Sequence, residues 1–245
     1  MSKTSQIIQI AVVSIISHSV ANATLTFSRG EIVFTGYNSD NPDEVAFFTV
    51  SEISDGASIN FTDNGWLSSG GFRTGEGVIT WENNTGQTIS AGTEIILTGS
   101  SSASVGGLSS TSGSFSLSSS GDQVFAYQVA NPTNDSDILG ALQMNSGWES
   151  NATSSNTSAA PGSDFMALAI SPERDSAYYE GPTTFSSVSD LQIQITDLDN
   201  WTTSNSRITF DSPRTFTIIP EVSATLPVGL FILVSLVRYR NRMHH

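Results

Sequence analysis

Glu31-Ile32-Val33-Phe34-Thr35-Gly36-Tyr37 is followed, after a short break, by Val45-Ala46-Phe47-Phe48-Thr49-Val50. Both runs are short and rich in β-branched and aromatic residues, which is the composition of β-strands. The break between them holds Asn, Ser, Asp and Pro, the residues that form turns. The two runs therefore predict a pair of neighbouring strands, and no long helical period competes with them.

Nine more runs of the same kind extend this pattern along the chain. They are rich in Val, Ile, Phe and Thr, and Gly or Asn commonly stands between them. A succession of short strands without long helices predicts an all-β fold, and an antiparallel β-sandwich within that class. The expected strands cover residues 59–62, 78–81, 94–98, 114–117, 124–129, 138–144, 165–169, 208–210 and 216–219.

One segment has a pattern that fits two structures. The apolar residues between positions 188 and 198 recur at helical spacing, whereas Leu191, Ile193 and Ile195 alternate as they would in a strand. We expect a short helix over residues 189–195, with Asp190 in its first turn.

Two further segments, residues 100–120 and 150–158, are dominated by Ser and Gly. They contain little apolar surface to offset the entropy that ordering a chain costs. We therefore expect mobile loops in both places.

The C-terminal end has the pattern of a membrane anchor. The uncharged run from Val222 to Val237 supplies 16 residues, somewhat fewer than the roughly 20 that cross a bilayer as a helix. Arg238, Arg240 and Arg242 follow directly and can reach lipid headgroups. Their position predicts that this end stays in the cytoplasm and that the preceding domain lies outside. A buried core helix at the C-terminus is the alternative.

The N-terminal end has the pattern of a cleaved signal peptide. Lys3 precedes a short apolar core at residues 7–16, and Ala21-Asn22-Ala23 matches the small-x-small site that signal peptidase cuts. We expect residues 1–23 to be removed and residues 24–219 to form the exported β-sandwich domain. An uncleaved amphipathic helix is the alternative.

The order of Pro220-Glu221-Val222, apolar run and basic cluster resembles the PEP-CTERM sorting signal of bacterial surface proteins. The signal would comprise a motif at 220–222, a transmembrane helix at 222–237 and a basic tail at 238–245. The resemblance implies that an exosortase, a membrane enzyme, cuts near Pro220-Glu221 and passes the protein from the inner membrane to the surface. Val222 stands where the family has a second proline.

The region between the two end signals is acidic and lacks several reactive side chains. Residues 24–219 hold five Arg against 22 Asp and Glu, a net charge of −17. Such a surface repels nucleic acid, which proteins bind through Lys and Arg. The region also lacks His, Cys and Lys. That excludes Ser-His-Asp and Cys-His catalysis, His-ligated zinc and lysine chemistry, and leaves carboxylate chemistry or a hard cation held by oxygens.

Six motifs in this region resemble those of a group of secreted bacterial surface proteins whose members are similar to lamin-tail-like domains. The resemblance implies an immunoglobulin-like β-sandwich and an exported location, and it implies no catalytic residue. The motifs are GEIVFTGYN at 30–38, FTDNGW at 61–66, FRTGEG at 72–77, GDQVFAY at 121–127, AYYEGP at 177–182 and DNW at 199–201.

Asp63-Asn64-Gly65-Trp66 ends an expected strand and is a candidate ligand site. The oxygens of Asp63 and Asn64 are of the kind that hold Ca²⁺, and Trp66 beside them offers a ring on which a sugar can stack. The alternative is that Asn64 and Gly65 form a tight turn with positive φ while Trp66 packs inward.

Two other groups are candidates of the same sort. Asp197 and Asp199 have the spacing of calcium-loop ligands, but Thr202 and Ile208 stand where an EF-hand needs Gly and Glu, which excludes that motif. A helix-ending, loop-capping role is the alternative. Tyr178-Tyr179 is a candidate carbohydrate contact, with core packing as its alternative.

Taken as a sequence, the chain is expected to be a non-enzymatic surface or extracellular-matrix protein with a structural or adhesive role. Signal peptidase and an exosortase are its expected processing enzymes, extracellular polysaccharide its expected contact, and Ca²⁺ the ion its oxygens would take. A carbohydrate-binding module is the first alternative. A carboxylate-dependent hydrolase is the second, and it requires two acids facing one cleft roughly 5 to 10 Å apart.

Overall fold

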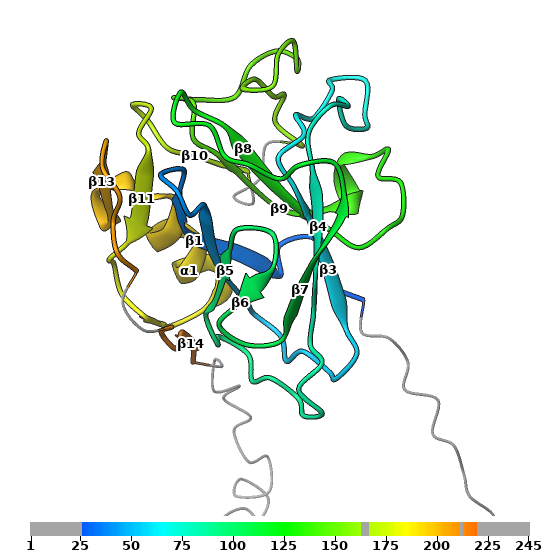
Figure 1. The fold of residues 1–245 in the computed structure, drawn as a ribbon. Coiled ribbons are helices and arrows are strands. Elements are labelled where there is room, and N and C mark those ends of the chain that lie inside the picture. Colours follow the sequence, from blue (N-terminus) through cyan, green and yellow to red (C-terminus); the bar gives the residue numbers. More distant parts are fainter. Residues whose placement is uncertain (1–25, 163–166, 211–212, 220–245) are drawn as a thin grey trace, which may run out of the picture.

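Two six-stranded sheets face each other across a shared apolar core (Figure 1). The computed structural model describes residues 26–162, 167–210 and 213–219. Two more short strands, β12 (Thr184–Phe185) and β14 (Thr217–Ile218), pair separately. The strands of the two large sheets are β1 (Ile32–Asn38), β2 (Glu44–Thr49), β3 (Ser58–Thr62), β4 (Val78–Glu82), β5 (Ile95–Thr98), β6 (Ser102–Ala103), β7 (Gly107–Ser112), β8 (Gln123–Tyr127), β9 (Ile138–Gln143), β10 (Ala167–Ala169), β11 (Ser176–Tyr179) and β13 (Trp201–Ser204).

The first sheet has the strand order β13-β11-β1-β2-β5-β6, and the second has the order β10-β9-β8-β3-β4-β7. Alternation along each strand fills the space between them. In β4, for example, Ile79 and Trp81 are buried in the core while Thr80 lies on the outer face. Phe47 of the first sheet meets Phe61 of the second with 4.9 Å between ring centroids. The predicted all-β sandwich is therefore confirmed.

Most strand pairs are antiparallel, as predicted, but two are parallel: β9 with β10, and β12 with β14. A parallel pair needs a long crossover between its strands. Between β9 and β10 the chain makes such a crossover, which brings Trp148 against the outer face of β8, where its ring lies 5.9 Å from that of Phe125.

The predicted helix is confirmed as α1 (Val188–Thr196). Ser187 precedes it in extended conformation, and its hydroxyl accepts a hydrogen bond from the backbone N–H of Asp190 at 3.1 Å. The Asp190 carboxylate in turn accepts the N–H of Ser186 at 2.8 Å. Leu191 and Ile195 are buried on one face, so the helical period prevails over the alternating one.

Three predictions about local structure are wrong. Residues 114–117 and 208–210 form no strand, and the segment 100–120 is not a continuous loop, because it contains β6 and β7. Four of the six residues of β7 are exposed and Leu108 packs against the core, so this edge strand carries a weak apolar signal and is ordered by its pairing with β4.

Within the described ranges, no helix combines the length and the apolar composition needed to cross a bilayer. The predicted span at 222–237, the motif Pro220-Glu221-Val222 and the basic tail lie outside the described residues, as do the signal peptide and its cleavage site at Ala21 and Ala23.

Candidate functional site

Asp63 lies at the end of β3 and is 1% exposed. One carboxylate oxygen accepts the backbone N–H of Gly77 at 2.7 Å and the other accepts that of Ser116 at 2.8 Å. Asn64 is likewise engaged, since its side-chain oxygen accepts the N–H of Glu76 and its amide donates to the Thr62 hydroxyl. These oxygens hold the chain in place, and the geometry gives the predicted Ca²⁺ ligation no support.

The prediction that Gly65 is needed for a tight turn with positive φ is also wrong. Gly65 has no positive φ. A Cβ at this position would lie 2.4 Å from the carbonyl oxygen of Thr157 and 2.9 Å from Cβ of Ala152. Gly65 is therefore required because the 152–157 segment passes directly over it.

Asp197 ends α1 and begins the 3-10 helix η2 (Leu198–Asn200), where its side chain accepts the N–H of Asp199 at 3.1 Å. The capping role is thus confirmed. Among the described residues, no group of three or more His, Cys, Asp or Glu is arranged to hold a metal ion. The Ca²⁺ prediction for Asp197 and Asp199 has no further ligands around it.

The three aromatic residues that were candidate sugar contacts are buried. Trp66 is 1% exposed, Tyr178 6% and Tyr179 0%. The Trp66 indole N–H donates to the Asp135 carboxylate at 2.9 Å, and its ring meets Phe72 edge to face. Tyr178 stacks on Phe210 with 4.6 Å between centroids. Because no ring face is free, the predicted stacking on a sugar has no exposed platform at these positions.

Three buried or half-buried carboxylates fix the segment that crosses one end of the sandwich. The backbone N–H groups of Ser116, Leu117 and Ser118 donate to Asp63, Asp43 and Asp122 respectively, each at 2.8 Å. We call these three acids the Asp clamp. They replace the strand partners that this segment lacks, while Phe115 and Leu117 enter the core. Sequence reasoning missed this role, since the donors are remote in the chain from two of the acceptors.

Burial raises the pKa values of several acids at this end of the fold. Burial raises the pKa of Asp122 to about 8, against the lowering effect of its backbone hydrogen bonds, and the charges of Glu76 and Asp63 add to the rise. Burial together with the charge of Asp63 raises the pKa of Glu76 to about 7. One oxygen of Glu76 is buried without a hydrogen-bond partner. Asp63 and Asp122 are almost fully buried, however, and both accept hydrogen bonds from backbone N–H groups.

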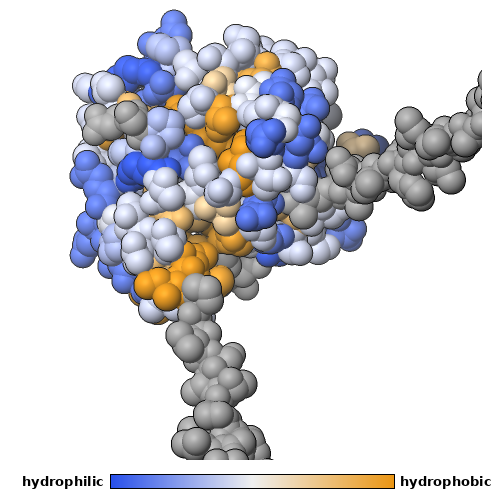
Figure 2. Space-filling view, turned by 90° about the horizontal axis from the view of Figure 1, so that it is seen from below, coloured by the Kyte–Doolittle hydropathy of each residue, from blue (hydrophilic) through white to orange (hydrophobic). Residues whose placement is uncertain are grey.

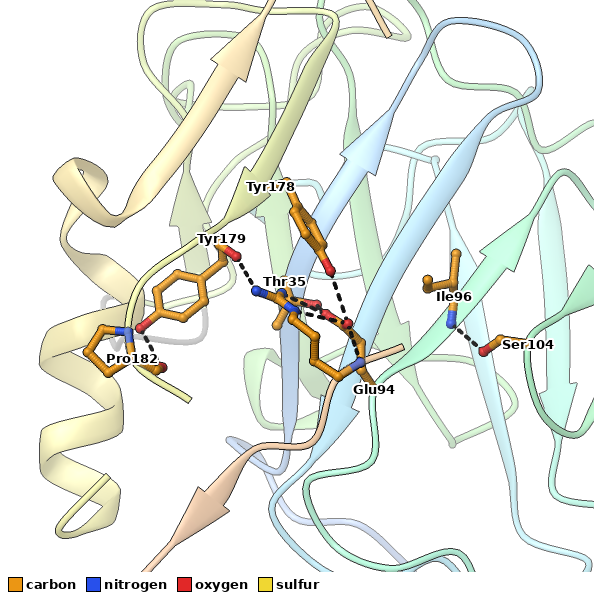
Figure 3. A network of polar contacts seen from close by, with 8 residues as sticks. Thr35, Glu94, Ile96, Ser104, Tyr178, Tyr179 and Pro182 are labelled. Atoms are coloured by element: carbon orange, nitrogen blue, oxygen red, sulfur yellow. Dashed lines mark hydrogen bonds and ion pairs between the residues drawn. The ribbon is translucent and has the colours of Figure 1, made fainter. Parts of the chain in front are cut away.

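A second polar network lies on the outer face of the first sheet (Figure 3). Glu94, 0% exposed, accepts hydrogen bonds from the Thr35 hydroxyl at 2.6 Å, the Tyr178 hydroxyl at 3.2 Å and the Arg214 guanidinium at 2.8 Å. It also accepts the backbone N–H of Arg214 at 2.9 Å. Burial alone would raise the pKa of Glu94, but these hydrogen bonds outweigh it and lower the pKa. We call this arrangement the Glu94 clasp.

The Glu94 clasp fastens the last described segment to the sandwich. Arg214 also donates to the carbonyl of Tyr179 and stacks its guanidinium over the ring of Tyr178, 4.1 Å from the centroid. Two residues later, Phe216 stacks on Phe48 of β2 with 4.3 Å between centroids. The segment 213–219 is therefore an integral part of the domain.

Hydrophobic side chains gather beside the C-terminal exit of the described chain (Figure 2). Ile219, the last described residue, is 51% exposed. Next to it a hollow of about 230 Å³ opens between Phe48, Val50, Phe216 and Ile218. The end face from which the chain leaves is thus apolar, although the domain as a whole is strongly acidic.

The largest hollow among those described lies on the outer face of the second sheet, over β3, β4, β7 and β8. It has a volume of about 510 Å³, and we call it the outer groove. Its floor and walls include Asn60, Phe72, Val78, Thr111, Tyr127 and Asn131. A smaller hollow of about 230 Å³ continues along β4 and β7, with Thr80 and Ser109 in its lining. None of the candidate site residues predicted from the sequence lines either hollow.

Comparisons with protein-family models, with curated proteins and with solved structures find no match to this chain. The fold and the geometry of these sites therefore carry the functional argument.

Proposed function

We propose that the chain is an exported, non-enzymatic surface protein with a structural or adhesive role. Its two end signals carry the export part of the proposal: signal peptidase would remove residues 1–23, and an exosortase would act near Pro220-Glu221. The mature domain would be held in the inner membrane by residues 222–237 and then displayed at the cell surface or in the extracellular matrix.

The single structural observation that supports the proposal is the C-terminal exit. The described domain ends at Ile219 in an apolar face, and the Glu94 clasp fixes this end to the sandwich five residues earlier, at Arg214. The predicted span begins at Val222, three residues further on. At roughly 3.3–3.6 Å per extended residue, the apolar face would lie within about 10 Å of the membrane surface. Such a short distance suits a domain that is anchored to the membrane at its apolar end face.

The finer fold assignment belongs to the same proposal. The motifs at 30–38, 61–66, 72–77, 121–127, 177–182 and 199–201 support an immunoglobulin-like sandwich of the lamin-tail kind. In the structure they lie in or beside the strands, and they supply several of the residues that lock the fold, among them Asp63, Asp122 and Tyr178. Their role is to hold the sandwich together.

A hydrolase is the weaker candidate. It would need a pair of acids facing one cleft, whereas Asp63 and Asp122 are almost fully buried and accept backbone N–H groups. A carbohydrate-binding module is favoured by one observation, the outer groove, and the groove offers a ligand site that the buried aromatic candidates do not.

Fractionation of the native host tests the proposal, with the full chain compared against a chain that stops after Ile219. We expect the full chain in the membrane and surface fractions, and the truncated chain in the periplasm or medium with the same circular dichroism spectrum. Identical distributions of the two chains would refute a sorting role for residues 220–245. Recovery of the full chain from the cytosol would refute export altogether.

A further inference from the structure

The outer groove, with Tyr127 and Asn60, and the smaller hollow, with Thr80 and Ser109, lie along one row of side chains that crosses four adjacent strands. Tyr127 of β8 is the cross-strand partner of Asn60 in β3, Asn60 is the partner of Thr80 in β4, and Thr80 is the partner of Ser109 in β7. Four strands about 4.8 Å apart give the row a length of about 14 Å. The groove is therefore an extended feature of a rigid sheet, suited to a ligand longer than one small ring.

Several polar groups in the groove have no partner among the described residues. Among the described residues, neither the Tyr127 hydroxyl nor the Asn60 side-chain amide nitrogen has a hydrogen-bond partner, and the side chain of Asn131 has none either. The Asn60 carbonyl oxygen, by contrast, accepts from the Thr80 hydroxyl at 2.8 Å, which fixes the direction in which its amide points. The groove thus presents oriented donors and acceptors to whatever enters it.

An aromatic side chain forms one wall. Phe72 is half-buried and packs against Trp66, Phe125 and Tyr127, with 5.0, 5.3 and 5.4 Å between ring centroids. The hairpin that carries it is closed by a hydrogen bond from the Leu67 N–H to the Gly71 carbonyl at 2.9 Å. Phe72 is therefore held in position before a ligand arrives, which lowers the entropy cost of binding.

Charge is absent from the lining of the outer groove. No Asp, Glu, Arg or Lys lines it, and the smaller hollow at the Ser109 end has one charged residue in its lining, Glu82, although residues 24–219 carry a net charge of −17. An anionic ligand would meet the repulsion of the whole domain, and a cation would find no carboxylate in the groove. Hydroxyls, amides and an aromatic wall together match the hydroxyls and the apolar faces of an uncharged sugar.

The opposite outer face is covered in part by other described segments of the chain. On the first sheet, Phe210 covers Tyr178, and the Glu94 clasp fills the neighbouring space. The C-terminal part of the chain closes that face and leaves the face of β3, β4 and β7 open.

We propose that the outer groove binds a neutral polysaccharide chain along the row from Tyr127 to Ser109. The inference rests on the proposed extracellular role, because a secreted domain meets such polymers outside the cell. Tyr127, Asn60 and Asn131 supply hydrogen bonds to sugar hydroxyls, and Phe72 supplies the apolar wall.

The test uses the full chain, purified in a zwitterionic detergent without a sugar headgroup, so that the detergent does not compete. Affinity electrophoresis is run through gels containing dextran, hydroxyethyl cellulose, xylan, mannan or the anionic polymer alginate. We expect retardation by at least one neutral polymer and none by alginate. Retardation by no neutral polymer, or by alginate alone, would overturn the proposal without bearing on export, which fractionation tests separately.

Two matched variants locate the site. Thr111→Arg places a large charged side chain in the groove, and Thr203→Arg places the same side chain on exposed edge strand β13 of the other sheet. We expect the first to weaken the retarding interaction at least tenfold and the second to leave it unchanged. Tyr127→Phe, which removes only the hydroxyl, should weaken it about fivefold, the equivalent of about 1 kcal/mol. Equal binding by the two arginine variants would overturn the assignment to the groove.

Discussion

The Glu94 carboxylate has no access to water, and its hydrogen bonds fasten Arg214 to the sandwich. Replacing it by Gln puts an NH₂ group opposite donors and leaves the Arg214 charge without a counter-ion. Breaking a buried charge pair in this way costs about 3–5 kcal/mol. We therefore predict that Glu94→Gln lowers the free energy of unfolding by about 3 kcal/mol, measured by urea denaturation with tryptophan fluorescence.

The matched control is Glu44→Gln. Glu44 pairs with Arg207 at 2.6 Å, and the two side chains are 13% and 30% exposed, against 0% and 22% for Glu94 and Arg214, so water replaces more of what is lost. A loss of about 1 kcal/mol is expected. Equal losses in the two variants would show that the Glu94 clasp is no stronger than a surface pair.

Gly70 offers a second prediction at the residue scale. Its φ is +85°, and a Cβ would lie 2.1 Å from the carbonyl oxygen of Thr133. Gly86 has a similar φ of +75° but open space around it. Gly86→Ala should cost about 1 kcal/mol, the backbone penalty alone, whereas Gly70→Ala should cost about 2 kcal/mol more because the two loops must separate. Equal losses in thermal unfolding would contradict the close packing of this wall of the outer groove.

The contacts of individual side chains were predicted least well from the sequence. The cap at Asp197 followed from the local pattern, whereas the composition gave no sign that buried carboxylates would bind backbone N–H groups. The partners of Asp63 and Asp43 lie 53 and 74 residues away, and they are backbone N–H groups, which every residue has. No side-chain pattern signals such an acceptor.

At the scale of elements, the segment 115–118 is the most specific case. Its apolar residues alternate into the core, so its pattern predicts a strand, yet its N–H groups bind the Asp clamp in place of a neighbouring strand. We predict that the amides of Ser116, Leu117 and Ser118 exchange with deuterium as slowly as those of paired strands. Exchange as fast as that of solvent-exposed amides without a hydrogen bond would contradict the clamp.

The core strands, β1 to β5, β8 and β9, were predictable because each carries apolar side chains into the space between the sheets. Strands β6, β7, β11, β12 and β13 were missed. Strand β7 is Ser- and Thr-rich, and the other four have only two to four residues each, so their order comes from neighbours in space. The reverse error occurred at 208–210, where Ile208 and Phe210 cover a sheet face without joining a ladder. The outer groove is likewise formed by strands that pair across the sheet, so the sequence alone did not predict it.

For the whole molecule, the buried acids predict an unusual dependence of stability on pH. Glu76 and Asp122 have folded-state pKa values of about 7 and about 8, above their ordinary values. Between the ordinary and the raised values the folded state binds more protons than the unfolded state, so stability falls as pH rises. The lowered pKa of Glu94 acts oppositely, and only at acid pH below its ordinary value. Stability should therefore peak near pH 5.

We predict that the melting temperature falls by about 5 °C between pH 5 and pH 8, a loss of about 2 kcal/mol after allowance for the partial exposure of Glu76. Glu76→Gln should flatten this dependence and raise the melting temperature at pH 8, and the exposed Glu52→Gln should do neither. A melting temperature that rises from pH 5 to pH 8 would contradict the assignment of these pKa shifts.

The central claim, that a sandwich domain is exported and released from its C-terminal tail, is tested most directly by the intact mass of the protein recovered from the surface of its native host. The account predicts a chain that begins at Thr24 and ends near Pro220-Glu221. A chain of 245 residues with both ends uncut, dissolved in the cytosol, would contradict it.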